Sequence, residues 1–332
     1  MKIGYIRLNK DYNRTKAKAA FIAFFCFTAL LPLRLLFKPN DHDGYVEIME
    51  GVNSGTANSD MVGKAWVALF YLKVSSIIPY EIATNILFFL YLYIVALHAK
   101  NYTTIVFHLV LIAPLSAYFG YITKEALLLF ILLTTYLISR IKSEYTLITF
   151  FILMGVFSIL IRQYYLPLLL LALFIPRLKE SLAYIIGFIL LMTLLLFGQD
   201  VFDLIYQVKK EMWFRLKYYS SVNTLFDLGF EEHGNFWLVS KVWFNNILSI
   251  FTTFFTHFGL VGIASLINLI TIFFTFKITK EDAIVEIWLF GAFSLLFISY
   301  LVPDSGTFVR HSTMLSLVAI FSVILNNKKI TK

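Results

Sequence analysis

The stretch that decides the fold is AAFIAFFCFTALLPLRLLF, residues 19–37, whose only charged side chain is Arg34. Apolar runs of this kind, about 15–20 residues long, recur along the chain between short polar breaks. A helix needs about 20 apolar residues to cross a bilayer, and the runs lack the alternating pattern of a membrane β-barrel. They predict an all-α, polytopic integral membrane protein.

The composition supports this class. Of the 332 residues, 59% are hydrophobic and 14% are charged, whereas average soluble domains carry about 25% charged residues. The net charge of +8 comes from short basic clusters between apolar runs, where they orient spans, so we do not expect a nucleic-acid partner. The single cysteine, Cys26, excludes a disulfide within the chain. We expect one membrane domain, residues 1–332.

The basic clusters also predict the topology. Residues 1–18 are rich in Lys and Arg, which places them in the cytoplasm by the positive-inside rule. The polar segment 38–64 is then a periplasmic loop. The next run, 65–79, is short for a span and contains Lys73, so we interpret it as a helix on or dipping into the outer surface. If it crossed, the loop with Arg140 and Lys142 would lie outside, against the rule.

This topology has about ten spans, with both termini cytoplasmic. A second long polar loop, 199–242, is periplasmic, and 243–257 is expected as a surface or re-entrant helix. The expected spans are residues 19–37, 82–98, 103–121, 126–139, 145–161, 164–175, 182–198, 258–276, 283–302 and 312–325.

Several charged groups fall on the periplasmic side of this topology. Asp41 and Asp43, beside Gly44, can act as a general base or hold a divalent cation through oxygen ligands. A solvated acidic loop without chemistry is the alternative for each carboxylate.

Lys124 and Glu125 are expected at a helix start, where Lys124 can bind a phosphate and Glu125 is a second candidate base. Helix capping and interfacial anchoring explain the pair equally well. Arg162 is the most informative single residue, because an arginine between two apolar runs requires an anion, either a buried carboxylate or a phosphate.

Further cations come from the second half of the chain. In 199–242, Lys210, Arg215 and Lys217 alternate with aromatic residues, a pattern that suits a diphosphate, sugars or lipid headgroups, and also a plain interfacial helix. Arg310 and His311 open the last expected span and can bind an anion. His108 and His257 lie in apolar runs, where packing or hydrogen bonding is the more common role.

In layout the chain resembles bacterial polysaccharide-assembly membrane proteins. Isolated external arginines such as Arg162 and Arg310, and a large periplasmic loop, are similar to the Wzy class of O-antigen and capsule repeat-unit polymerases. The acidic first loop around Asp41 and Asp43, the surface helix after it, and the stretch from Pro114 to Glu125 resemble GT-C glycosyltransferases.

The resemblance implies a glycosyltransferase of the bacterial inner membrane that polymerises polyprenyl-diphosphate-linked repeat units at the periplasmic face. Asp41, Asp43 or Glu125 would be the base, with Lys124, Arg162, Arg310 and His311 on the diphosphate and Lys210, Arg215 and Lys217 guiding it. The partners would be the lipid-linked oligosaccharide, the bilayer and a chain-length regulator. No cofactor is expected, a cation at Asp41 and Asp43 being the open alternative. The alternative functions are a GT-C-type enzyme that adds a single sugar, a lipid-linked glycan flippase or transporter, and an acyltransferase or ligase.

Overall fold

The fold consists of helices. The computed structural model describes residues 12–36, 40–54, 62–99, 102–116, 120–178, 187, 192, 199–219, 228, 230, 235–256, 260–302 and 305–326, and contains no β-strand within them. Its helices are α1 (Tyr12–Leu36), α2 (Asn40–Ser54), α3 (Val62–Ser75), α4 (Tyr80–His98), α5 (Tyr102–Ser116), α6 (Lys124–Ile141), α7 (Thr146–Leu160), α8 (Tyr165–Phe174), α10 (Gln199–Tyr219), α11 (Phe236–Thr256), α12 (Leu260–Thr279), α13 (Val285–Leu301) and α14 (Ser305–Asn326).

The all-α prediction is confirmed. Four segments are long and apolar enough to cross a membrane, Thr15–Pro32, Tyr80–His98, Ser143–Leu160 and Thr307–Asn326, and shorter apolar helices accompany them. The count of about ten spans stays a prediction, and the expected span 182–198 lies outside the described residues apart from two positions.

Polar contacts show the direction in which each helix runs through the bundle. At one end, the Tyr71 hydroxyl of α3 donates to the Thr123 carbonyl, 3.1 Å away, just before α6 begins. We call this end of the bundle the α3 end. At the opposite end, His98 Nε2 lies 3.0 Å from the Tyr136 hydroxyl, near the ends of α4 and α6. Both helices therefore run away from the α3 end.

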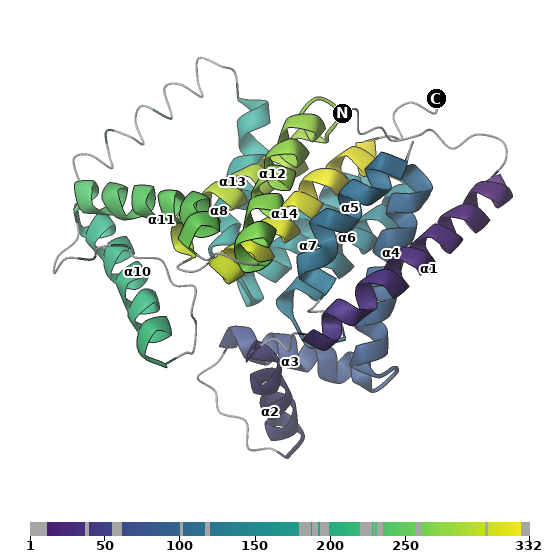
Figure 1. Ribbon diagram of the computed structural model, residues 1–332, viewed down its shortest axis with the longest axis horizontal. Coiled ribbons are helices and arrows are strands. Elements are labelled where there is room, and N and C mark those ends of the chain that lie inside the picture. The colour runs from purple at the N-terminus through teal and green to yellow at the C-terminus, as the bar shows by residue number, and fades with distance from the viewer. Residues whose placement is uncertain are drawn as a thin grey trace.

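The position of α3 follows from these contacts. Because α4 starts at the α3 end, α3 and the turn to Tyr80 do not take the chain to the opposite end. Figure 1 shows α3 lying across the bundle at this end, with α2 beneath it. The segment 65–79 therefore stays at the α3 end of the bundle, and its place relative to a membrane stays a prediction.

Helix α14 is the centre of the bundle. It packs against α5, α6, α12 and α13 (Figure 1), and most of its side chains are buried. Its buried hydroxyls bond to its own backbone: Ser312 donates to the Phe308 carbonyl at 2.6 Å and Ser316 to the Ser312 carbonyl at 2.9 Å. These bonds satisfy polar groups in an apolar interior.

Close packing fixes α13 against α14. A Cβ atom added at Gly291 of α13 would lie 3.3 Å from the Leu315 carbonyl oxygen of α14, so a small residue lets the two backbones approach. The backbone N–H of Ile284, before α13, donates to the Ser322 carbonyl at 3.1 Å. Helix α13 therefore begins where α14 ends, and it returns the chain to the α3 end, where α14 starts.

Candidate functional site

The site is a buried ionic cluster at the α3 end. We call Glu125, Arg162, Arg310 and His311 the ionic cluster. Arg162 Nη2 lies 3.0 Å from one carboxylate oxygen of Glu125, and Arg310 Nη2 lies 2.8 Å from the other. The Glu125 side chain is only 3% exposed, and the Arg162 and Arg310 side chains are 9% and 13% exposed. The cluster joins residues from the start of α6, the break between α7 and α8, and the second turn of α14.

Glu125 is placed by the start of α6. Thr123 is the N-cap residue, and its Oγ1 accepts from the Ala126 N–H at 3.4 Å. Glu125 thus lies in the first turn, where the helix dipole favours a negative charge. The helix start predicted at Lys124 and Glu125 is confirmed, although Glu125 faces the protein interior.

Arg162 is placed by the break between α7 and α8. Its backbone N–H donates to the last carbonyls of α7, and its own carbonyl accepts from the Tyr165 N–H at 2.9 Å. The Arg162 Nη1 atom donates to the Tyr165 hydroxyl at 3.1 Å, and the guanidinium carbon lies 5.7 Å from the centre of that ring. Arg162 was predicted to pair with a buried carboxylate or a phosphate. In the structure it pairs with a buried carboxylate, that of Glu125.

His311 completes the cluster. Its Nδ1 lies 2.6 Å from Arg162 Nη1. Because a guanidinium only donates, Nδ1 accepts this bond, and the imidazole proton is on Nε2. Arg310 and His311 lie inside α14, which starts earlier than expected, at Ser305.

The ionic cluster is rich in cations. Glu125 lies between Arg162 and Arg310, and the half-buried Lys124 precedes it in the sequence. Cations held away from bulk water attract an anionic ligand strongly.

Three helices hold the turn that precedes the cluster. We call residues 120–123 the α6 turn. The Gly120 N–H donates to Thr84 Oγ1 of α4 at 2.9 Å, and the Ile122 N–H donates to His42 Nδ1 of α2 at 3.2 Å. Tyr71 of α3 contacts the same turn, as described above. Gly120 has φ of 89°, a left-handed conformation that glycine adopts without strain.

The acidic loop predicted around Asp41 and Asp43 contains a helix. Asp43 is exposed on α2, one residue after His42, whose ring lies 5.0 Å from that of Tyr121. Asp43 therefore follows directly after His42, which contacts the α6 turn. Asp41 belongs to α2, but its side chain is outside the described part of the chain.

The basic residues predicted in 199–242 lie on α10, which packs on α11 at the side of the bundle (Figure 1). Lys210 is half-buried, and Lys217 Nζ lies 4.6 Å from the centre of the Trp213 ring. The Arg215 side chain is outside the described residues. The structure thus brings together Glu125, Arg162, Arg310 and His311, with Lys124 beside them, and places Lys210 and Lys217 on a peripheral helix.

The roles of three residues were not predicted from the sequence. Tyr165 contacts Arg162, and His42 contacts the α6 turn; neither was singled out from the residues around it. Lys209 of α10 is buried, and its Nζ donates to the Tyr300 carbonyl, to Asn246 Oδ1 at 3.0 Å and to the Val302 carbonyl at 3.3 Å. It caps the end of α13. The spacing of Lys209 from Tyr206 and Trp213 could have indicated its burial, because these three residues share one face of α10.

Two histidines were expected in packing roles. His108 is buried and bonds through Nδ1 to the Tyr91 hydroxyl at 3.0 Å, which confirms that prediction. His257 is outside the described residues. Within the residues that the structure describes, no three His, Cys, Asp or Glu side chains are grouped to hold a metal ion.

Comparisons with known proteins do not add to this picture: no family model, no curated protein and no solved structure matches the chain.

Proposed function

We propose that the protein is a membrane glycosyltransferase that polymerises polyprenyl-diphosphate-linked oligosaccharide repeat units at the periplasmic face of a bacterial inner membrane. The observation that supports this function best is the pair of buried arginines, Arg162 and Arg310, that converge on Glu125 at one end of an apolar helix bundle. A diphosphate whose lipid stays in the bilayer reaches such a site without a nucleotide-binding domain.

The reaction forms one glycosidic bond and breaks another bond. The acceptor hydroxyl oxygen attacks the anomeric carbon of the donor, the bond from that carbon to the diphosphate oxygen breaks, and a base takes the hydroxyl proton. The leaving diphosphate gains negative charge, so fixed cations accelerate the reaction. Arg162 and Arg310 are the proposed diphosphate ligands, with Lys124 next to them.

Glu125 positions these arginines in this proposal. Its two carboxylate oxygens each bind one guanidinium, and two adjacent cations make a carboxylate a weak base. Each guanidinium has five N–H donors. In this proposal a phosphate oxygen replaces Tyr165 or His311 as an acceptor on Arg162, while Glu125 keeps both arginines in place. Asp43, exposed at the α3 end, is the proposed base, with Asp41 as the neighbouring candidate.

The test is a complementation experiment in the native host with its own copy of the gene deleted. Arg162→Ala should abolish long polymer and leave glycans of a single repeat unit on a gel, with normal protein in the membrane fraction. Arg177→Ala is the matched control, because Arg177 is half-exposed and pairs with Glu286 at 3.2 Å, away from the cluster.

The outcome separates the candidate functions. Normal chain length with Arg162→Ala contradicts the assignment of Arg162. In the deletion strain without complementation, absence of any surface glycan indicates a single-sugar transferase or a flippase. Full-length glycan lacking acyl groups indicates an acyltransferase.

A further inference from the structure

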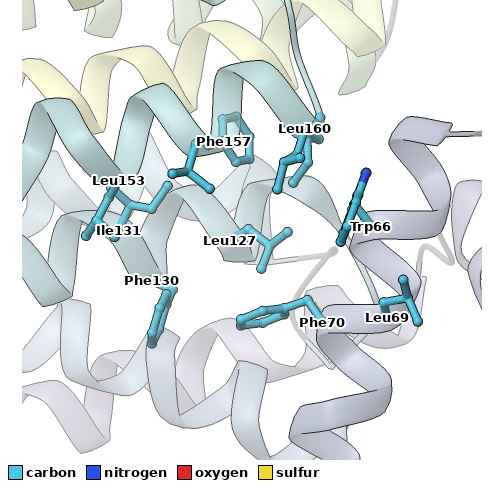
Figure 2. Close-up of a pocket in the computed structure, with 11 residues that line it drawn as sticks. Trp66, Leu69, Phe70, Leu127, Phe130, Ile131, Leu153, Phe157 and Leu160 are labelled. Carbon is cyan, nitrogen blue, oxygen red and sulfur yellow. The ribbon is translucent and has the colours of Figure 1, made fainter.

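An apolar cavity lies beside the ionic cluster. It has a volume of about 360 Å³ and is lined by residues of α3, α6 and α7 and by Ile161, which follows α7. Figure 2 shows Trp66, Leu69 and Phe70 of α3 facing side chains of α6 and α7 across this space. The residues that line it are all apolar: Trp66, Leu69, Phe70, Leu127, Phe130, Ile131, Leu153, Val156, Phe157, Leu160 and Ile161.

The cavity opens on the outer surface of the bundle. Trp66, Phe130 and Val156 are each exposed by two fifths or more, so this rim faces whatever surrounds the protein. The surroundings of an apolar helix bundle are the hydrocarbon of the bilayer. The hydrocarbon tail of a lipid can therefore enter the cavity from the side, between α3 and the helices α6 and α7.

One wall of the cavity packs on a residue that binds the ionic cluster. Phe157 lines the cavity and stacks on Tyr165 with ring centres 6.4 Å apart, and the Tyr165 hydroxyl accepts from Arg162. Ile161, which also lines the cavity, precedes Arg162. Phe70, on the facing wall, precedes Tyr71, which bonds to the α6 turn. A cationic site therefore adjoins an apolar cavity, which matches a ligand with an anionic head and a hydrocarbon tail.

We propose that this cavity holds one isoprenoid chain segment of the lipid-linked substrate while its diphosphate is on Arg162 and Arg310. The inference rests on the proposed function and adds the binding site of the lipid chain. The cavity is at the small end of the range for ligand pockets, about 300–1,000 Å³, so it takes a segment of one chain. Trp66, Phe70, Phe130 and Phe157 supply flat apolar surfaces for that chain.

The experiment is photolabelling of the purified full-length protein with an isoprenoid monophosphate that carries a diazirine near the phosphate end of the chain. Peptides from α3, α6 and α7 should carry the label. Unlabelled undecaprenyl phosphate should compete for it, and phosphatidylglycerol should not. Equal competition by phosphatidylglycerol, or labelling spread over all lipid-facing helices, would show ordinary bilayer lipid and overturn the proposal.

A matched pair of variants locates the site. Leu153→Trp fills the cavity and should lower labelling about tenfold, the effect of excluding roughly two methylene groups of the chain. Ile152→Trp adds the same side chain at the preceding residue, which is exposed and does not line the cavity, and should leave labelling unchanged. Leu69→Trp, from the α3 wall, gives a second blocking variant if Leu153→Trp does not fold.

The result is separable from the proposed function. If α3, α6 and α7 are labelled and Leu153→Trp lowers the labelling, but Arg162→Ala still makes long polymer, the lipid-binding site is supported and the polymerase assignment is wrong. If Arg162→Ala stops polymerisation but Leu153→Trp neither lowers labelling nor affects chain length, the polymerase assignment is supported and the proposed lipid-binding site is wrong.

Discussion

At the scale of single residues, the two arginines of the ionic cluster depend on one carboxylate. A buried charge is stable only when it is paired and hydrogen-bonded. Glu125 pairs with Arg162 and Arg310 together, so its loss leaves both guanidinium groups without that anion. This position differs from that of a general base, which needs a free lone pair directed at the substrate.

Glu125→Ala should therefore destabilise the purified protein by about 3–5 kcal/mol, the usual cost of breaking a buried ion pair from one side. A lower melting temperature in detergent measures this loss. Glu286→Ala, which removes the carboxylate from the pair with half-exposed Arg177, is the control and should cost at most about 1 kcal/mol. If Glu125→Ala lost activity with unchanged stability, Glu125 would act as the base.

At the scale of elements, the α6 turn connects α2, α3 and α4 to the cluster. His42, Tyr71 and Thr84 each bond to its backbone. The turn sets where α6 begins and hence where Glu125 lies. Its conformation depends on Gly120, since φ of 89° is unfavourable for residues with a Cβ atom.

Gly120→Ala should cost about 1–3 kcal/mol through backbone strain, and polymer chains should become shorter as the cluster moves. Gly155→Ala in α7 is the matched control: no atom lies within 4 Å of an added Cβ, and alanine favours a helix over glycine by up to about 1 kcal/mol. Thermal unfolding and gel analysis of the glycan give the two readouts. Equal stability of the two variants would show that the left-handed conformation of Gly120 is not required.

At the scale of the whole molecule, the order of helices determines which charges meet. The end of α7 and the start of α14 lie at the same end of the bundle. The expected order of spans placed Arg162 and Arg310 on one side, so their convergence was predictable from the sequence. That Glu125 lies between them was not predictable, because the order of spans does not say which helices are neighbours. The place of α6 beside both α7 and α14 is a property of packing.

The helix positions were predictable for a similar reason. Apolar runs and polar breaks located α4, α6, α7 and α13 to within a few residues. The helical state of α2 was not expected, because its polar composition suggested a loop. Packing of Tyr45, which is fully buried, against the bundle overrides that local tendency.

The topology gives a prediction at this scale. An activity reporter fused after Lys142 should report a cytoplasmic location, and one fused after Ser76 a periplasmic location, because these residues lie at opposite ends of the bundle. A fusion after Ile175, near the far end of α8, is a second cytoplasmic check. A periplasmic signal after Lys142 would invert the bundle and place the ionic cluster in the cytoplasm.

The central place of α14 has a consequence for biogenesis. The ribosome makes this helix after every other described helix, although α5, α6, α12 and α13 pack against it. In a nascent chain that has not reached residue 305, the faces of these four helices that contact α14 are uncovered. A chaperone that shields those faces would be needed until α14 is made, and Arg310 would close the ionic cluster as the last step of assembly.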